Sequence, residues 1–143
     1  MVSAVMKIYP IVILSAFSAV TALPGADWPC FGGPGRDFVS SEQGLVVKWG
    51  DNEPKKLWQS KIGAGYSSIV VGGGLAYAVG HESSKNAVRC LDAKTGALIW
   101  KYEYSCGKGA KYFDGGSRGT PALDDGLLFS LSHEGALFAF DAK

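Results

Sequence analysis

The chain has 143 residues, and its 14 lysines and arginines against 13 aspartates and glutamates leave a formal net charge of +1. A chain so close to neutral gives no argument for binding nucleic acid or an anionic membrane surface. Its 20 glycines are about twice the usual share of roughly 7%, which favours many turns over long helices.

Residues 1–22 are predicted to be a signal peptide. One basic residue, Lys7, precedes an apolar run from Ile8 to Ala22 that ends in small residues. The run is about 15 residues long, short of the roughly 20 that a membrane span prefers, and a retained anchor is the alternative. We therefore expect export to the periplasm or the extracellular space, and no transmembrane segment beyond this one.

Residues 23–55 are predicted to form an irregular arm, because the stretch from Asp27 to Asp37 is too rich in glycine and proline for a regular element. Trp28 and Phe31 are expected to pin this arm to the surface that follows. A short strand is predicted over residues 45–49.

The rest of the chain, residues 56–143, carries strand patterns separated by glycine-containing turns. A polar loop is expected at residues 81–86. The four strands from residue 66 onward are expected to form one antiparallel meander. Strands are predicted over residues 56–62, 66–71, 75–80, 87–92 and 97–104.

The clearest hairpin of the chain spans residues 90–102. Gly96 can take the positive φ that a type I turn with a bulge requires. The carboxylate of Asp92 is placed to accept hydrogen bonds from the turn amides.

A second unit repeats this pattern after an insertion at residues 105–116. The dipeptide His81-Glu82 recurs as His133-Glu134 at the same offset as the strands. Repeats of this size with four strands each are typical of β-propellers. We therefore predict an all-β fold, a partial β-propeller with about one complete and one incomplete four-stranded antiparallel blade, and expect the chain to be the start of a longer protein. The second unit is predicted from segments 118–123, 127–132 and 137–143, with a turn at 124–126.

The run Leu91-Asp92-Ala93-Lys94-Thr95-Gly96-Ala97-Leu98-Ile99-Trp100 resembles the tryptophan-docking motif of quinoprotein-type, PQQ-like propeller repeats. The resemblance covers about residues 56–143, and the arm resembles the start of exported, BamB-like members. It implies that the tryptophan ring is wedged between neighbouring blades. The structural blade motif is then made of Trp58, Asp92, Thr95, Gly96, Trp100 and Asp141.

The resemblance implies two classes of function, because such blades occur both in cofactor-free assembly scaffolds and in dehydrogenases that use PQQ and calcium. The first predicts a protein or cell-envelope partner and no catalytic residue. The second implies that Arg118, in the step Ser117-Arg118-Gly119, contacts the quinone. Two departures speak against it: the paired cysteines of those enzymes are absent, and Tyr66-Ser67-Ser68 stands where an acidic residue is expected. A third hypothesis is a non-functional, aggregation-prone truncation.

Each candidate site residue also has a structural interpretation. Arg118 can be satisfied by backbone carbonyls or by Asp114. The repeated His-Glu pairs fit turn capping, since two ligands would leave a metal under-coordinated, and no metal site is predicted. Asp92 and Asp141 are predicted to cap turns rather than to act as acids or bases.

Three cysteines make an odd count, so one thiol must stay unpaired within the chain. Cys90 lies in a strand pattern and is expected to be buried as a small apolar residue. Cys106 lies in a polar loop, and a bridge between Cys90 and Cys106 is left open by the sequence.

Overall fold

The computed structural model describes residues 25–50, 54–109 and 114–143. The predicted signal peptide and the alternative of a retained anchor lie outside the described residues. Within the described part, no helix is long and apolar enough to cross a membrane.

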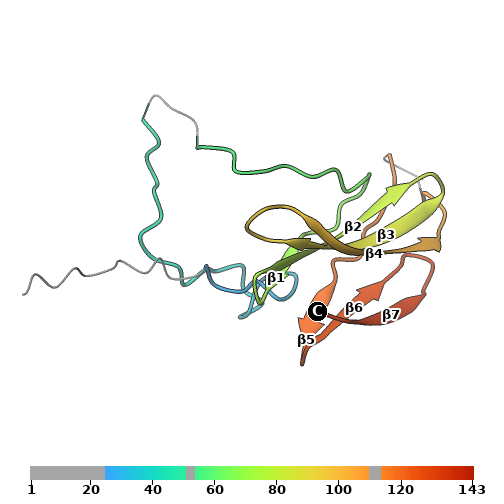
Figure 1. The fold of residues 1–143 in the computed structure, drawn as a ribbon. Helices are drawn as coiled ribbons and strands as arrows, with labels where there is room; N and C mark the ends of the chain where they lie inside the picture. The colour runs from blue at the N-terminus through green and yellow to red at the C-terminus, as the bar shows by residue number, and fades with distance from the viewer. Residues whose placement is uncertain (1–24, 51–53, 110–113) are drawn as a thin grey trace, which may run out of the picture.

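The described residues form two antiparallel sheets, which lie one above the other in Figure 1. Blade one is the four-stranded sheet with the order β1-β2-β3-β4, and blade two is the three-stranded sheet with the order β5-β6-β7. The predicted all-β fold with one complete and one incomplete blade is confirmed. The strands are β1 (Val70–Gly72), β2 (Leu75–Glu82), β3 (Lys85–Asp92), β4 (Leu98–Ser105), β5 (Ala122–Asp124), β6 (Leu127–Leu131) and β7 (Leu137–Asp141).

The prediction of a polar loop at residues 81–86 is wrong. Strands β2 and β3 continue through it, with His81 paired to Asn86, and a turn at Ser83 and Ser84 joins them. Both serines have positive φ, 48° and 64°, the backbone that a two-residue hairpin turn needs. His81 and Asn86 are buried and bond one another, Nδ1 to Oδ1 at 3.0 Å, so their polarity does not interrupt the sheet.

Two predicted strands are shorter than expected, because their first residues pair between the blades. Strand β1 begins at Val70 rather than at residue 66, and β5 begins at Ala122 rather than at residue 118. The Tyr66 amide donates to the Ser117 carbonyl at 2.7 Å, and the Ser68 amide donates to Thr120 Oγ1 at 2.9 Å. These bonds tie the start of one blade to the start of the other.

Residues 56–62 and 45–49 do not form the predicted strands. A strand needs a neighbouring ladder to accept its backbone hydrogen bonds, and neither segment has one among the described residues. Residues 54–65 instead lie across blade one, on the side facing away from blade two (Figure 1).

The segment 54–65 can approach closely because this side of blade one carries small residues, which we call the small-residue face: Ala76, Ala78, Gly80 and Ala87. A Cβ atom on Gly80 would lie 1.6 Å from the Ile62 carbonyl oxygen, so any residue other than glycine would clash with this carbonyl. The buried Arg89 side chain lies among these small residues and donates to the same carbonyl at 2.8 Å. The guanidinium thus supplies the Ile62 carbonyl with a hydrogen-bond donor in place of a neighbouring strand.

The opposite side of blade one, which we call the aromatic face, packs against blade two. Its members are Tyr77, Val79, Val88, Cys90, Trp100, Tyr102 and Tyr104. Strand β7 supplies Phe138 and Phe140, whose rings lie 4.5 Å from Tyr104 and 5.1 Å from Tyr102 between centroids. With Leu128, the centre of this layer is buried, so the hydrophobic core lies between the two sheets.

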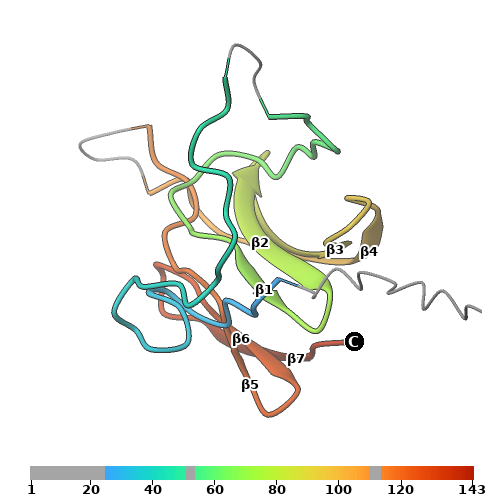
Figure 2. The same cartoon turned by 90° about the vertical axis from the view of Figure 1, so that its left-hand side faces the viewer.

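The arm is held to the first strand of each blade, as Figure 2 shows beside β1 and β5. Trp28 exchanges two backbone hydrogen bonds with Val71, at 2.8 and 3.0 Å, and the Leu123 amide donates to the Pro29 carbonyl at 2.7 Å. Trp28 is half-buried, with its ring against Gly33 of the same arm, and Phe31 is 60% exposed and packs edge-on against Phe38. The prediction that Phe31 pins the arm is wrong, since backbone bonds hold this stretch.

All three cysteines are free thiols in the described structure. Cys90 is buried as predicted. Cys106 is also buried, although the sequence places it in a polar loop, because it lies against Asn86 at the end of blade one.

Candidate functional site

The β3–β4 turn is capped by the side chain of Asp92. The Asp92 carboxylate accepts from the Lys94 amide at 3.1 Å and from the Thr95 amide and hydroxyl at 2.7 Å each. Gly96 has a φ of 73° and closes the turn by donating to the Asp92 carbonyl. The Thr95 hydroxyl, followed by the amides, lowers the pKa of Asp92, so this carboxylate is an ionised cap rather than a proton donor.

Trp58 docks on this turn from the segment that crosses the small-residue face. Its Nε1 donates to the Ala93 carbonyl at 3.0 Å. A Cβ atom on Gly96 would lie 2.5 Å from the Trp58 ring, so the indole rests directly on the glycine backbone. Trp58 therefore fixes residues 54–65 to blade one through its side chain.

Trp100 lies in the layer between the blades, 5.5 Å from Phe140 and 6.2 Å from Tyr77 between ring centroids. Its Nε1 is buried and has no hydrogen-bond partner within the described residues. In blade two, Asp141 accepts from the Lys143 amide at 2.9 Å, as Asp92 does from Lys94. The motif residues thus hold turns and blade contacts in both repeats.

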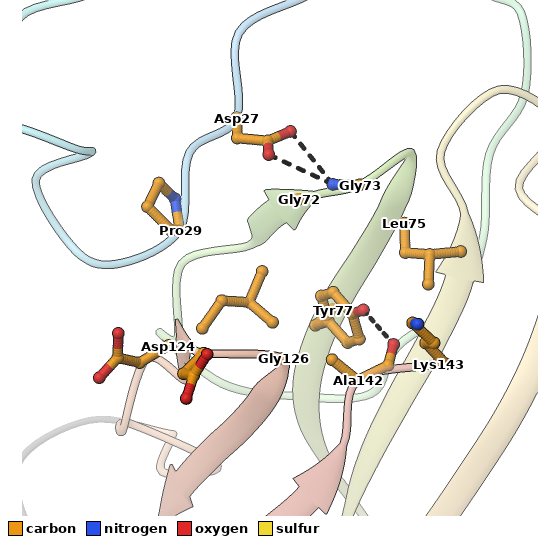
Figure 3. Close-up of a pocket in the computed structure, with 12 residues that line it drawn as sticks. Asp27, Pro29, Gly72, Gly73, Leu75, Tyr77, Asp124, Gly126, Ala142 and Lys143 are labelled. Atoms are coloured by element: carbon orange, nitrogen blue, oxygen red, sulfur yellow. Dashed lines mark hydrogen bonds between the residues drawn. The ribbon is translucent and has the colours of Figure 1, made fainter.

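A pocket of about 400 Å³ opens where the arm meets one end of both blades (Figure 3). Leu75, Tyr77 and Leu123 supply its apolar part. Charged side chains come from the arm and from blade two, and the Asp27 carboxylate accepts from the Gly73 amide at 3.2 Å. The pocket is lined by Asp27, Pro29, Gly72, Gly73, Leu75, Tyr77, Leu123, Asp124, Asp125, Gly126, Ala142 and Lys143.

Tyr77 links the pocket to the core. Its hydroxyl donates to the Ala142 carbonyl, as the dashed line in Figure 3 marks. Burial, together with neighbouring Cys90, raises the pKa of Tyr77 to about 12. The phenol is therefore a neutral hydrogen-bond donor, and the pocket has an apolar part with aspartates and a lysine around it.

The sequence did not point to this pocket, because its lining comes from residues about 100 positions apart. The arm is positioned mainly by backbone hydrogen bonds, which cannot be recognised from the amino-acid sequence. The sequence does contain one indication of the pocket's location, the equivalent turns at Gly73-Gly74 and Asp125-Gly126 in the first hairpin of each unit.

Arg118 is exposed and lies outside the lining of this pocket, in the connection that precedes β5. Its Nη2 donates to the carbonyl of Gly109. A backbone carbonyl is one of the partners expected from the sequence if Arg118 has a structural role. The contact of Arg118 with a quinone stays a prediction.

The repeated His-Glu pairs lie in different settings. His81 is buried at the end of β2, and its Glu82 lies 3.6 Å from the Arg89 guanidinium. His133 and Glu134 lie in the β6–β7 turn, where His133 Nδ1 is 3.7 Å from Cys106 Sγ. Burial, followed by the Glu134 carboxylate, raises the pKa of the Cys106 thiol.

Comparison with known proteins finds a match to a protein-family model. The model of the family described as outer membrane protein assembly factor BamB matches residues 18–143. No curated protein and no solved structure matches the chain.

Proposed function

Because the chain belongs to the family of PQQ-like repeats described as outer membrane protein assembly factor BamB, we propose that it is an exported β-propeller protein that serves as a binding and assembly scaffold in the cell envelope. Its partner is a protein of that compartment. The observation that carries the proposal is the family match over residues 18–143, supported by two blades joined face to face.

The two blades follow one rule of stacking, which supports a scaffold built by repetition. Blade two contacts the aromatic face of blade one through Leu128, Ser130, Phe138 and Phe140, whose positions match residues on the side of blade one that carries the small-residue face. Its other side therefore corresponds to a second aromatic face. Leu127, Leu131 and Leu137 on that side are 41%, 55% and 67% exposed. A further blade of the same type fits there. The full set on this side is Leu127, Phe129, Leu131, Leu137 and Ala139.

The pocket supplies the partner chemistry. Leu75 and Leu123 offer apolar contact, and Asp124 and Asp125 place carboxylates beside it. This combination favours a peptide side chain with an apolar stem and a cationic tip, such as lysine or arginine. The proposed partner contact is therefore a basic, extended segment of an envelope protein.

The alternative, a dehydrogenase using PQQ and calcium, rests on Arg118. The guanidinium is exposed and donates to a backbone carbonyl, which supports a structural role for Arg118. No catalytic step is derived from it.

The test uses the full chain expressed in a bacterium with an outer membrane. Cell fractionation should place it in the envelope, and Leu14→Arg, which interrupts the apolar run, should keep it in the cytoplasm. A photo-crosslinking residue at Asp125 should form an adduct with an envelope protein, and the same residue at Glu82, 71% exposed by side chain, should not. Cytoplasmic retention of the unaltered chain, or equal adducts at both positions, would contradict the proposal. Dye reduction after addition of PQQ and calcium would favour the dehydrogenase instead.

A further inference from the structure

Three side chains of metal-binding type converge between the blades, at the end opposite the pocket. They are Cys106, which follows β4, and His133 and Glu134 in the β6–β7 turn. Cys106 Sγ lies 3.7 Å from His133 Nδ1, and Glu134 Oε1 lies 4.0 Å from His133 Nε2. One ligand atom from each residue lies within 4.8 Å of the other two.

The spacing of the sulfur and the nitrogen is that of a tetrahedral zinc site. Zinc–sulfur and zinc–nitrogen bonds of about 2.3 and 2.0 Å at a tetrahedral angle separate the two ligand atoms by about 3.5 Å. Cys106 and His133 therefore need almost no movement. One ligand atom of each residue lies within 4.8 Å of the others, so Glu134 has to close by at most roughly 1.5 Å, and its side chain is 51% exposed.

Neighbouring groups hold these ligands in place. Asn86 Nδ2 donates to Cys106 Sγ at 3.3 Å, and the Gly107 amide donates to Glu134 Oε1 at 2.7 Å. The Ser132 hydroxyl accepts from the amide of Glu134 at 3.2 Å and so fixes the turn that carries both blade-two ligands. Such outer contacts orient ligands before a metal arrives.

The equivalent position of blade one provides a natural comparison. His81 and Glu82 repeat the same dipeptide, but His81 is bonded to Asn86 and Glu82 lies near Arg89. Among the described residues, a cluster of cysteine, histidine and carboxylate is found where Cys106, at the end of blade one, meets the β6–β7 turn. The His-Glu dipeptide alone therefore does not form a metal-binding cluster, and the buried Cys106 sulfur distinguishes the blade-two copy from the blade-one copy.

We propose that Cys106, His133 and Glu134 bind one divalent ion of the zinc class. The Cys106 S–H proton is released to solvent as the sulfur–metal bond forms, and a water molecule completes the four ligands on the exposed side of His133. The ion joins the end of blade one to the β6–β7 turn of blade two, so it clamps the two blades together.

The experiment titrates cobalt(II), and then zinc(II), into the reduced, chelator-treated full chain. One equivalent of cobalt should give the near-ultraviolet thiolate charge-transfer band and the visible bands of a tetrahedral ion, and zinc should abolish both. Cys106→Ser and His133→Ala should remove the charge-transfer band or weaken binding at least about tenfold. Glu134→Gln, at a half-exposed position that folding tolerates, should also weaken binding. Circular dichroism of each variant confirms that it is folded.

The matched controls are Cys30→Ser, which removes a thiol outside the cluster, and Glu82→Gln, which alters the equivalent carboxylate of blade one. Both should bind cobalt as the unaltered chain does. A charge-transfer band that survives Cys106→Ser, or no band at one equivalent in the unaltered chain, would overturn the proposal. Neither outcome depends on the scaffold function.

Discussion

Replacing Gly80 with alanine tests how residues 54–65 are attached to blade one. The new Cβ atom would lie 1.6 Å from the Ile62 carbonyl oxygen and 2.5 Å from its carbon, both backbone atoms. Real Cβ atoms essentially never come within 3.0 Å of a non-bonded heavy atom outside the neighbouring residues, so the segment has to move away from the sheet. Its movement breaks the 2.8 Å hydrogen bond from Arg89 to Ile62.

The expected loss of stability follows from that bond. A hydrogen bond to a charged group contributes about 1.5–3 kcal/mol, and overpacking without release costs about 1–3 kcal/mol. By either route the free energy of unfolding should fall by about 2 kcal/mol. Urea denaturation followed by far-ultraviolet circular dichroism measures it.

Gly35→Ala is the matched control, because the nearest atoms to its new Cβ belong to the flexible Asp37 side chain in the arm. It should change the free energy of unfolding by less than about 0.5 kcal/mol. An unchanged urea midpoint for Gly80→Ala would refute the placement of Ile62 on the small-residue face.

Three further outcomes are expected from the same structure. Trp58→Phe, which keeps a ring on Gly96 but loses the bond to the Ala93 carbonyl, should lower the free energy of unfolding by about 1 kcal/mol in urea denaturation. The pKa of Tyr77 is raised from 10.0 to about 12, so the folded state holds its proton more tightly and stability should fall as pH rises between these values; Tyr77→Phe should flatten this fall in thermal melts taken at pH 9 to 12. The pKa of Asp92 is lowered from 3.8, so its contribution is present above that value and is lost as pH falls through the folded pKa; Asp92→Ala should lower the thermal midpoint at pH 7 and reduce its acid dependence.

The sequence predicted what local chemistry decides. The β3–β4 hairpin was found because Asp92 and Gly96 each meet a requirement of the same turn. The meander and the repeat followed from alternating apolar residues and equally spaced turns. These features depend on neighbours a few positions apart, so they are visible without a structure.

The errors occurred where a partner comes from another part of the fold. Residues 66–69 pair across the blades instead of extending β1, and the buried polar pair His81 and Asn86 looks like a loop when its hydrogen bond is unknown. Likewise, the approach of Cys106 to His133 depends on how blade two stacks on blade one. No spacing in the chain encodes that contact.

The most direct test of the account is a double-mutant cycle between Tyr104 and Phe138, the ring pair from opposite blades whose centroids are 4.5 Å apart. Both residues are changed to leucine, singly and together, and the free energy of unfolding is measured for each variant. Blades that stack face to face predict a coupling energy of about 0.5–1.5 kcal/mol. A coupling energy of zero would contradict the stacking from which both proposals proceed.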